Sequence, residues 1–468
     1  MPIVNSIPWE RSHARSWERS HRALTHHAHK GVTVKLSRGT TAGSVIAGAA
    51  AFALLATGCA SDAGASDGDV ELTITTFGTF GYDDLYKQYE DENPGVTIKA
   101  TNIDTGGNAR TDAFTKLAAG SGLSDVVAVE EGWLGQIMEV SDQFVDLGDH
   151  GADDVKDRWI DWKLSQATDP DGRIIGYGTD IGPTGLCYNG ALFEAAGMPS
   201  DREAVAELFG GEDATWEQYF DLGKQYFDAT GKPWFDHSGF VWNSIVNQLD
   251  EGYYTADGKL NVEGNDELKA RFLELAEAAQ YGLSADQAAW DWGGGKAFVD
   301  GTFATFVCPG WMLGVVQGQV EAGGGDASTG WDFADVFPGG AGNWGGAFLS
   351  VPKTSEHPEE AAKLAEWLTA PEQQIKQFEA AGTFPSTTEA QEKLAADATP
   401  NEFFNDAPVG AILASRAEGV IAQYKGPHDS LIQENVFGPA LKSVDEGTKD
   451  GPAAWDEAIS LLNEVVPD

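Results

Sequence analysis

Hydrophobic and polar residues alternate along the chain with two different periods. From residue 70 to 75 every second position is apolar, which is the period of a β-strand. The next apolar positions follow the period of a helix, with Leu85 and Tyr89 on one face and a stop at 93–95. A second alternating segment at 96–100 predicts another strand. The chain therefore starts with strand, helix and strand in succession.

The same alternation continues through the rest of the chain. A helix is predicted over 111–119, and the run at 125–129, apolar after its first residue, suits a buried parallel strand. Strands alternating with helices predict an α/β fold. The other predicted elements are strands at 186–188 and 303–307, and helices at 192–196, from 215 onward, at 267–280, 359–369, 372–381 and 452–465.

The N-terminal segment has the pattern of an export signal. Residues 44–57 contain no charge and follow Lys35 and Arg38, which predicts a signal peptide over 1–58. Its apolar part is shorter than the ~20 residues that a membrane-spanning helix needs. Residues 55–59 resemble the bacterial lipobox, in which the cysteine is lipidated, so Cys59 is the predicted membrane anchor and 59–69 a flexible tether. An ordinary signal peptide with a chance cysteine is the alternative.

The first 30 residues are rich in His and Arg and make this signal unusually long. We hypothesise that translation begins near Val32 or Val34 rather than at Met1. Mass spectrometry of the unprocessed precursor checks this, because peptides from residues 1–30 would contradict it.

Acidic residues dominate the composition. The chain has 73 Asp and Glu against 30 Lys and Arg, a formal net charge of −43 at pH 7. Such a charge excludes nucleic acid as a partner and disfavours strongly anionic ligands such as uronides and sugar phosphates.

Two cysteines follow the predicted anchor, Cys187 and Cys308. Outside the membrane an even pair is compatible with one disulfide. Cysteine is also a common small buried residue, so two separate buried thiols stay open at this point.

Patterns that would indicate an enzyme are weak. The four histidines beyond residue 58 are too far apart in sequence to suggest a metal site. The segment Trp-Asp-Trp-Gly-Gly-Gly-Lys at 290–296 lacks the first glycine and the final Ser or Thr of a phosphate loop. Glu130 and Glu131 could act as an acid and base pair, but adjacent residues on an extended segment point in opposite directions. No cofactor and no metal are expected.

Tryptophan gives a stronger signal. Its flat apolar face matches the C–H faces of a pyranose ring, while Asp, Glu and Asn bind the hydroxyls. Core packing is the alternative for each individual residue. The tryptophans in Gly-rich or turn-like contexts, where a core role is awkward, are Trp133, Trp242, Trp290, Trp292, Trp311 and Trp344.

The order and spacing of several segments resemble extracellular solute-binding protein family 1, the maltose-binding-protein-like lipoproteins that serve ABC importers of carbohydrates. The resemblance covers nearly the whole chain beyond the tether. The family often has Asn-Gly-Pro-Trp where this chain has Cys-Pro-Gly-Trp at 308–311, so the backbone near Trp311 is expected to differ. The matching segments are YDDLYKQYEDENPGVTIK, AAGSGLSDVVAVE, LCYNGALFEAAGMP, TWEQYFDLGKQY, GKAFVDGTFATFVCPGW and HPEEAAKLAEWLTAPEQQ.

The resemblance implies a two-lobe periplasmic-binding-protein fold of the α/β class, in which hinge strands join the lobes and the ligand lies in a cleft between them. Crossings are expected near 178–183, 331–336 and 382–385. The N-terminal lobe would then comprise 70–182 and 332–382, and the C-terminal lobe 183–331 and 383–468.

The cleft residues follow from this expectation. Ligands of open α/β sheets lie beyond the carboxyl ends of the strands, and the family places a sugar-stacking tryptophan after its Gly-Pro step, which implies Trp311 as the main contact. Glu130, Asp104 and Asp180 are the expected hydroxyl acceptors. The other expected ligand-binding residues are Phe80, Trp133, Trp242, Asn243, Trp290, Trp292, Trp344, Tyr424 and His428.

The expected function is capture rather than catalysis. A carbohydrate would hold the lobes closed, and ABC permease subunits, driven by a separate ATPase subunit, would receive it from a monomer anchored to the outer face of the membrane. The many tryptophans suggest an oligosaccharide, with a neutral gluco- or cello-oligosaccharide favoured. A surface-anchored glycoside hydrolase or lyase and a wall-attached structural protein are the alternatives.

Overall fold

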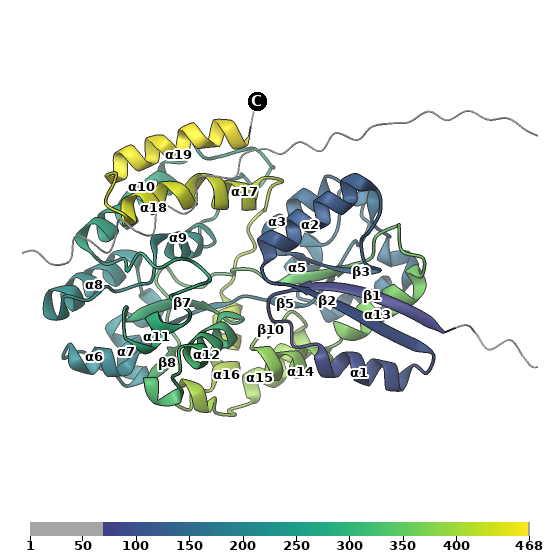
Figure 1. Cartoon of the computed structure of the whole chain (residues 1–468), viewed down its shortest axis with the longest axis horizontal. Helices are drawn as coiled ribbons and strands as arrows, with labels where there is room; N and C mark the ends of the chain where they lie inside the picture. The colour runs from purple at the N-terminus through teal and green to yellow at the C-terminus, as the bar shows by residue number, and fades with distance from the viewer. Residues whose placement is uncertain (1–68, 467–468) are drawn as a thin grey trace, which may run out of the picture. The chain divides into compact units, whose positions relative to one another are not determined.

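The computed structural model describes residues 69–466 (Figure 1). The predicted signal peptide, the lipidated Cys59 and all of the predicted tether except Asp69 lie outside the described residues. Within 69–466, no helix combines the length and the apolar character that crossing a membrane requires.

The larger of two main sheets begins with the predicted strand and helix alternation. β1 (Val70–Phe77), β2 (Val96–Ile103) and β3 (Val126–Glu130) are parallel, and the strand order is β2-β1-β3-β9-β4. β9 (Ala347–Ser350) returns from late in the chain and pairs antiparallel with β3 and with β4 (Tyr177–Gly178).

Alternation along the strands explains how helices cover this sheet. Leu72 and Ile74 pack in one cluster with Leu85 and Tyr89 of α1 (Asp83–Glu92), while Leu117 of α2 (Gly106–Ala119) belongs to a separate cluster on the other side. The sequence predicted α2 to start at 111. It starts at Gly106 because the Thr105 side chain accepts the backbone N–H of Asn108 and caps the helix.

The smaller sheet is antiparallel throughout, in the order β7-β6-β8. Its strands are β6 (Thr184–Asn189), β7 (Thr305–Pro309) and β8 (Trp331–Ala334), and every residue in them is buried. A disulfide joins Cys187 of β6 to Cys308 of β7, which resolves the two alternatives left by the sequence.

The remaining helices surround the two sheets (Figure 1). Those predicted at 267–280, 359–369, 372–381 and 452–465 are present within one residue at each end. The helices not yet named are α3 (Glu131–Met138), α4 (Ala152–Val155), α5 (Asp161–Gln166), α6 (Gly190–Ala195), α7 (Arg202–Leu208), α8 (Trp216–Thr230), α9 (Ser238–Val246), α10 (Asp266–Tyr281), α11 (Lys296–Val299), α12 (Met312–Ala322), α13 (Pro358–Leu368), α14 (Pro371–Ala381), α15 (Thr388–Ala396), α16 (Val409–Glu418), α17 (Asp429–Ile432), α18 (Gly438–Asp445) and α19 (Gly451–Val465).

The chain passes between the two sheets along three crossing segments. The first contains β5 (Asp180–Ile181), which pairs with β10 (Phe384–Pro385) of the third. The second lies between β8 and β9, at 335–346, and so begins after Ala334. The sequence placed it near 331–336, but β8 belongs to the smaller sheet. The lobe boundaries themselves remain a prediction.

A buried polar network connects the crossing segments. Asn343 donates to Glu131 at 2.9 Å and accepts the Gly182 N–H at 2.7 Å. Asp180 accepts the backbone N–H of Ala347 at 3.0 Å. Lys163 is fully buried, with its ammonium 3.8 Å from the centre of the Phe348 ring, and burial lowers its pKa to about 8.

Candidate functional site

Aromatic rings gather where β7 ends and α12 begins. Trp290 and Trp311 lie face to face, with ring centroids 6.1 Å apart and planes inclined by 23°. Trp344 meets Trp311 edge-on at 5.5 Å, and Phe240 meets both Trp290 and Trp344 edge-on. These four side chains form the aromatic cluster. The structure therefore places three of the six tryptophans that the sequence singled out in this cluster, and a fourth, Trp292, packs against Trp290 and Phe240.

Glu130 adjoins this cluster from the larger sheet. It is the last residue of β3 and comes directly before α3. A β-carbon added to Gly345 would lie 3.0 Å from the Trp311 indole nitrogen and 3.9 Å from a Glu130 carboxylate oxygen. A β-carbon on Gly132 would lie 3.0 Å from a Glu130 carboxylate oxygen, and one on Gly106 would make ordinary contact with the Glu130 side chain at 3.8 Å. Gly345 thus lies between Glu130, at the end of β3 in the larger sheet, and Trp311, which follows β7 of the smaller sheet.

The electrostatics of Glu130 differ from those of an ordinary surface glutamate. Burial raises its pKa from 4.5 to about 7, and the negative charges of Glu131 and Glu434 add to the shift. The Gly132 N–H and the Lys425 ammonium act in the opposite direction. Near neutral pH the Glu130 carboxyl can therefore lose its proton and accept hydrogen bonds from a ligand.

Its neighbour Glu131 has a different environment. Glu131 is buried and accepts hydrogen bonds from Gln166 at 2.7 Å and from Asn343 at 2.9 Å. The carboxylates of Glu130 and Glu131 thus lie in different surroundings, as expected because adjacent side chains on an extended backbone point in opposite directions. This arrangement does not support a paired acid and base at 130–131.

Helices α2 and α3 face the segment 425–434, and α3 and α17 lie side by side (Figure 1). Arg110 of α2 forms an ion pair with Glu434 at 2.7 Å. A β-carbon on Gly135 would lie 2.4 Å from the Lys425 carbonyl oxygen, so only glycine permits this approach. Arg110, Gly135, Lys425 and Glu434 were not predicted from the sequence.

The C-terminal segment supplies a second group of aromatic and polar side chains. Tyr424 is 46% exposed and lies edge-on to Tyr254 at 6.3 Å, and the Tyr254 hydroxyl is 3.2 Å from Nδ1 of His428. Two predicted residues, Tyr424 and His428, are thus neighbours of Tyr254, at the boundary with α3. They lie on the segment that contacts Gly135.

The other predicted residues lie apart from the aromatic cluster or support it. Asp104 is exposed in the loop before α2 and accepts from Asn108 at 2.8 Å. Asn243 is half-buried on α9. Phe80 packs edge-on against Phe77 and Tyr82 in the larger-sheet core.

Four of the predicted ligand-binding residues are buried and already engaged in packing or hydrogen bonds, and their contact with a ligand remains a prediction. Trp242 is fully buried, packs on Phe437 and donates to Tyr253. Trp292 is fully buried and donates to Asp236 at 3.0 Å.

Trp133 and Asp180 are the other two. Trp133 lies 2% exposed in the core beside Phe114. Asp180 is buried in the crossing network, where it accepts from Thr179 and Ala347. Packing against strands and helices, which the sequence does not show, takes up these side chains.

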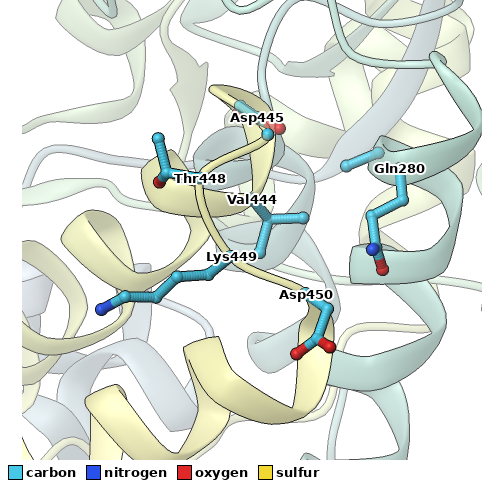
Figure 2. Close-up of a pocket in the computed structure, with 8 residues that line it drawn as sticks. Gln280, Val444, Asp445, Thr448, Lys449 and Asp450 are labelled. Carbon is cyan, nitrogen blue, oxygen red and sulfur yellow. The ribbon is translucent and has the colours of Figure 1, made fainter.

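One surface hollow lies away from the aromatic cluster. It has a volume of about 480 Å³ and lies between Gln280 of α10 and the loop from Val444 to Asp450 that joins α18 to α19 (Figure 2). No aromatic side chain lines it. Across residues 69–466 the structure also contains no group of three or more His, Cys, Asp or Glu side chains that could hold a metal ion.

Comparisons with known proteins agree with this architecture. The family model described as bacterial extracellular solute-binding protein matches residues 84–405. An arabinooligosaccharide-binding protein of Bacillus subtilis (strain 168) is 26% identical over 227 residues, which are 46% of this chain and 49% of that protein. The chain thus spans about half the length of this curated relative.

Solved structures match over most of the chain. The crystal structure of an extracellular solute-binding protein family 1 member is 46% identical, with a TM-score of 0.74 over 85% of this chain and 99% of that one. An ABC transporter associated binding protein from B. animalis subsp. lactis Bl-04, in complex with beta-1,6-galactobiose, is 21% identical, with a TM-score of 0.69 over 83% of this chain and 96% of that one.

These matches confirm the predicted α/β fold with two lobes, and they favour a binding protein over the hydrolase, lyase and structural alternatives. The family match covers more than half of the chain. The chain therefore belongs to the bacterial extracellular solute-binding protein family.

Proposed function

We propose that this protein captures a neutral oligosaccharide outside the cell and delivers it to ABC permease subunits, which a separate ATPase subunit drives. A gluco- or cello-oligosaccharide is the favoured ligand, and a monomer is the expected working form. The observation that carries this proposal is that Gly345 lies between Glu130 and Trp311, whose indole is stacked with that of Trp290. Two named relatives, one for arabinooligosaccharide and one with bound galactobiose, support the class of ligand.

The residues divide the work of recognition. Indole faces pack on the C–H faces of sugar rings, and the Glu130 carboxylate accepts hydroxyls. Because these groups come from the two lobes, a ligand that touches both stabilises the closed arrangement by its differential affinity. We infer one lobe built on the larger sheet and one built on the smaller sheet, which includes β8, with the ligand between them.

Lipid attachment at Cys59 would hold the protein on the outer face of the membrane after removal of residues 1–58. This places the binding site beside the permease subunits. Radiolabelled palmitate incorporation should be lost in Cys59→Ser and kept in the parent chain, while an ordinary secreted protein would show no label in either.

Calorimetry with a panel of neutral oligosaccharides tests the central proposal. We expect saturable binding of at least one member, with the ligand recovered intact by chromatography. Trp311→Ala should weaken that binding by about 100-fold, since it removes the aromatic side chain that contacts Trp290 and Trp344 and lies across Gly345 from Glu130. Cleaved product, or no binding across the panel, would refute the proposal.

A further inference from the structure

The contact between Trp290 and Trp311 differs from the other aromatic contacts around it. These two rings are stacked, whereas Phe240 and Trp292 meet Trp290 edge-on, and Trp344 meets Trp311 edge-on. Edge contacts support each indole from the side. The two indoles therefore turn one broad face toward each other.

The two stacked indoles differ in how strongly the surrounding residues restrain them. Trp311 is half-buried, and its indole N–H donates to the Trp344 carbonyl at 2.7 Å. Trp290 is 46% exposed. Trp311 is thus fixed by a hydrogen bond and an edge-on neighbour, while Trp290 stands at the surface.

The backbone that carries Trp290 is unusual. Trp290 and Trp292 have φ of 66° and 40°, in the left-handed region that bulky residues rarely adopt. Gly293 and Gly294 also have positive φ and are surrounded by open space, whereas a β-carbon on Gly295 would lie 1.9 Å from the Gln319 carbonyl oxygen. Gly295 is therefore the fixed end of the loop, and the two preceding glycines allow it to turn.

We propose that Trp290 and Trp311 form a two-sided clamp for one pyranose ring, and that Trp290 selects rings whose substituents are all equatorial. In this clamp Trp311 stays in place, and the 290–294 loop, which carries Trp290, moves. The inference rests on the proposed carbohydrate-binding function and deepens it. It assigns the choice between gluco or xylo rings and galacto or manno rings to a single side chain.

Distances set the size of the movement. Carbon atoms pack at about 3.5–4.0 Å, so a ring between two indole faces needs about 7–8 Å between them. The present centroid separation is 6.1 Å. The centroid separation is the upper limit of the spacing between the two faces, so Trp290 must move outward by at least roughly 1 Å to admit a sugar.

Stereochemistry explains the selectivity. A pyranose has two flat C–H faces only when its hydroxyls are equatorial, because an axial hydroxyl projects from one face. A single indole can pack on the opposite face of such a sugar, which carries no axial hydroxyl. A second indole would cover the face with the axial hydroxyl and bury that hydroxyl without a hydrogen-bond partner, which costs free energy. Equatorial hydroxyls point outward around the ring edge and stay free to bind polar groups, of which Glu130 lies across Gly345 from Trp311.

Calorimetry with β-1,4-linked gluco-, galacto- and manno-tetraoses, and with an arabinofuranose tetraose, tests the clamp. The parent protein should bind the gluco ligand at least tenfold more tightly than the other three. Trp290→Ala should weaken gluco binding at least tenfold and galacto and manno binding less than threefold, so that the preference disappears. Tyr281→Ala, which removes another exposed aromatic side chain, from α10, is the matched control and should change none of these affinities.

Fluorescence gives an independent measurement. The gluco ligand should protect one more acrylamide-accessible tryptophan in the parent protein than in Trp290→Ala. Equal binding of the four ligands, tightest binding of the furanose, or an equal loss for all ligands in Trp290→Ala would overturn the clamp and leave the carbohydrate proposal standing. Failure of every saccharide to bind the parent protein would overturn both.

Discussion

The two sheets contribute different chemistry to the candidate site, and different forces stabilise them. The larger sheet is mainly parallel, and its strand ends and helices supply the charged groups Arg110 and Glu130. The smaller sheet is antiparallel, contains the disulfide, and is followed by the indole of Trp311. A ligand that needs both hydrogen-bond acceptors and flat apolar faces must therefore contact both halves, which makes closure depend on the ligand.

The largest effect should come from removing the disulfide of the smaller sheet. The double variant Cys187→Ala, Cys308→Ala should lose about 3–5 kcal/mol of unfolding free energy, because the bond closes a long loop in the unfolded chain. Urea denaturation measures the loss. Amide exchange should accelerate in β6 and β7 and stay unchanged in β1 and β2; uniform acceleration would contradict the division into two differently stabilised halves.

The next effect concerns the contact between the halves. Gly135→Ala places a β-carbon 2.4 Å from the Lys425 carbonyl oxygen, so α3 and the 425–434 segment must separate. Saccharide affinity should fall by about 30-fold, or about 2 kcal/mol, with the melting temperature nearly unchanged. Gly318→Ala is the control, because its β-carbon would meet open space on α12. An unaltered affinity in Gly135→Ala would show that closure does not use this approach.

Glu130 tests the polar contribution of the larger sheet. Its pKa is raised from 4.5 to about 7 in the folded protein, so the folded state binds more protons and loses stability as pH rises through this window. Glu130→Gln removes the titrating carboxyl and with it this loss of stability at high pH. The melting temperature of the variant relative to the parent should be similar at pH 4 and clearly higher at pH 8, and a difference that is the same at both pH values would contradict the assignment.

The same variant should bind saccharide about tenfold more weakly at pH 8, because an amide replaces an ionised acceptor. The affinity of the parent protein should rise from pH 5 to 8, while that of the variant should stay flat. Calorimetry across this range gives both curves. A parallel rise in the two proteins would assign the titration to another group.

The smallest effect should come from the ion pair between the halves. Arg110 is mostly buried, but Glu434 is 44% exposed, so solvent weakens their attraction. Arg110→Gln and Glu434→Gln should each change saccharide affinity by about two- to fivefold, with a coupling energy below about 1 kcal/mol that declines in high salt. A double-mutant cycle measures this coupling, and a larger, salt-independent value would make the pair a main determinant of closure.

The order of elements could be read from the sequence because local periodicity records which face of a strand or helix is buried. The helices at 358–368 and 371–381 show this well, since each starts with a proline and has its own apolar stripe. The start of α2 was missed because one hydroxyl, that of Thr105, determines it. The second crossing was placed too early because nothing in the composition of β8 shows which sheet it joins.

The site was harder to predict than the fold. Trp290 and Trp292 are two residues apart in the same Gly-rich segment, yet one is 46% exposed and the other fully buried. Only the tertiary contacts of Trp292 with Phe306 and Asp236 distinguish the two residues. Arg110 escaped notice because its partner Glu434 lies 324 residues away, although a basic residue near a strand end is a usable signal in so acidic a chain.

The position of the disulfide also constrains how the protein matures. Neither cysteine has any exposed surface, so an oxidant can reach the two thiols only while their surroundings are still open. Cys308 enters the exported chain 121 residues after Cys187, and the bond must wait for it. Oxidation therefore has to precede the final compaction of this half, and a chain that compacted earlier would have to open again before the bond could form.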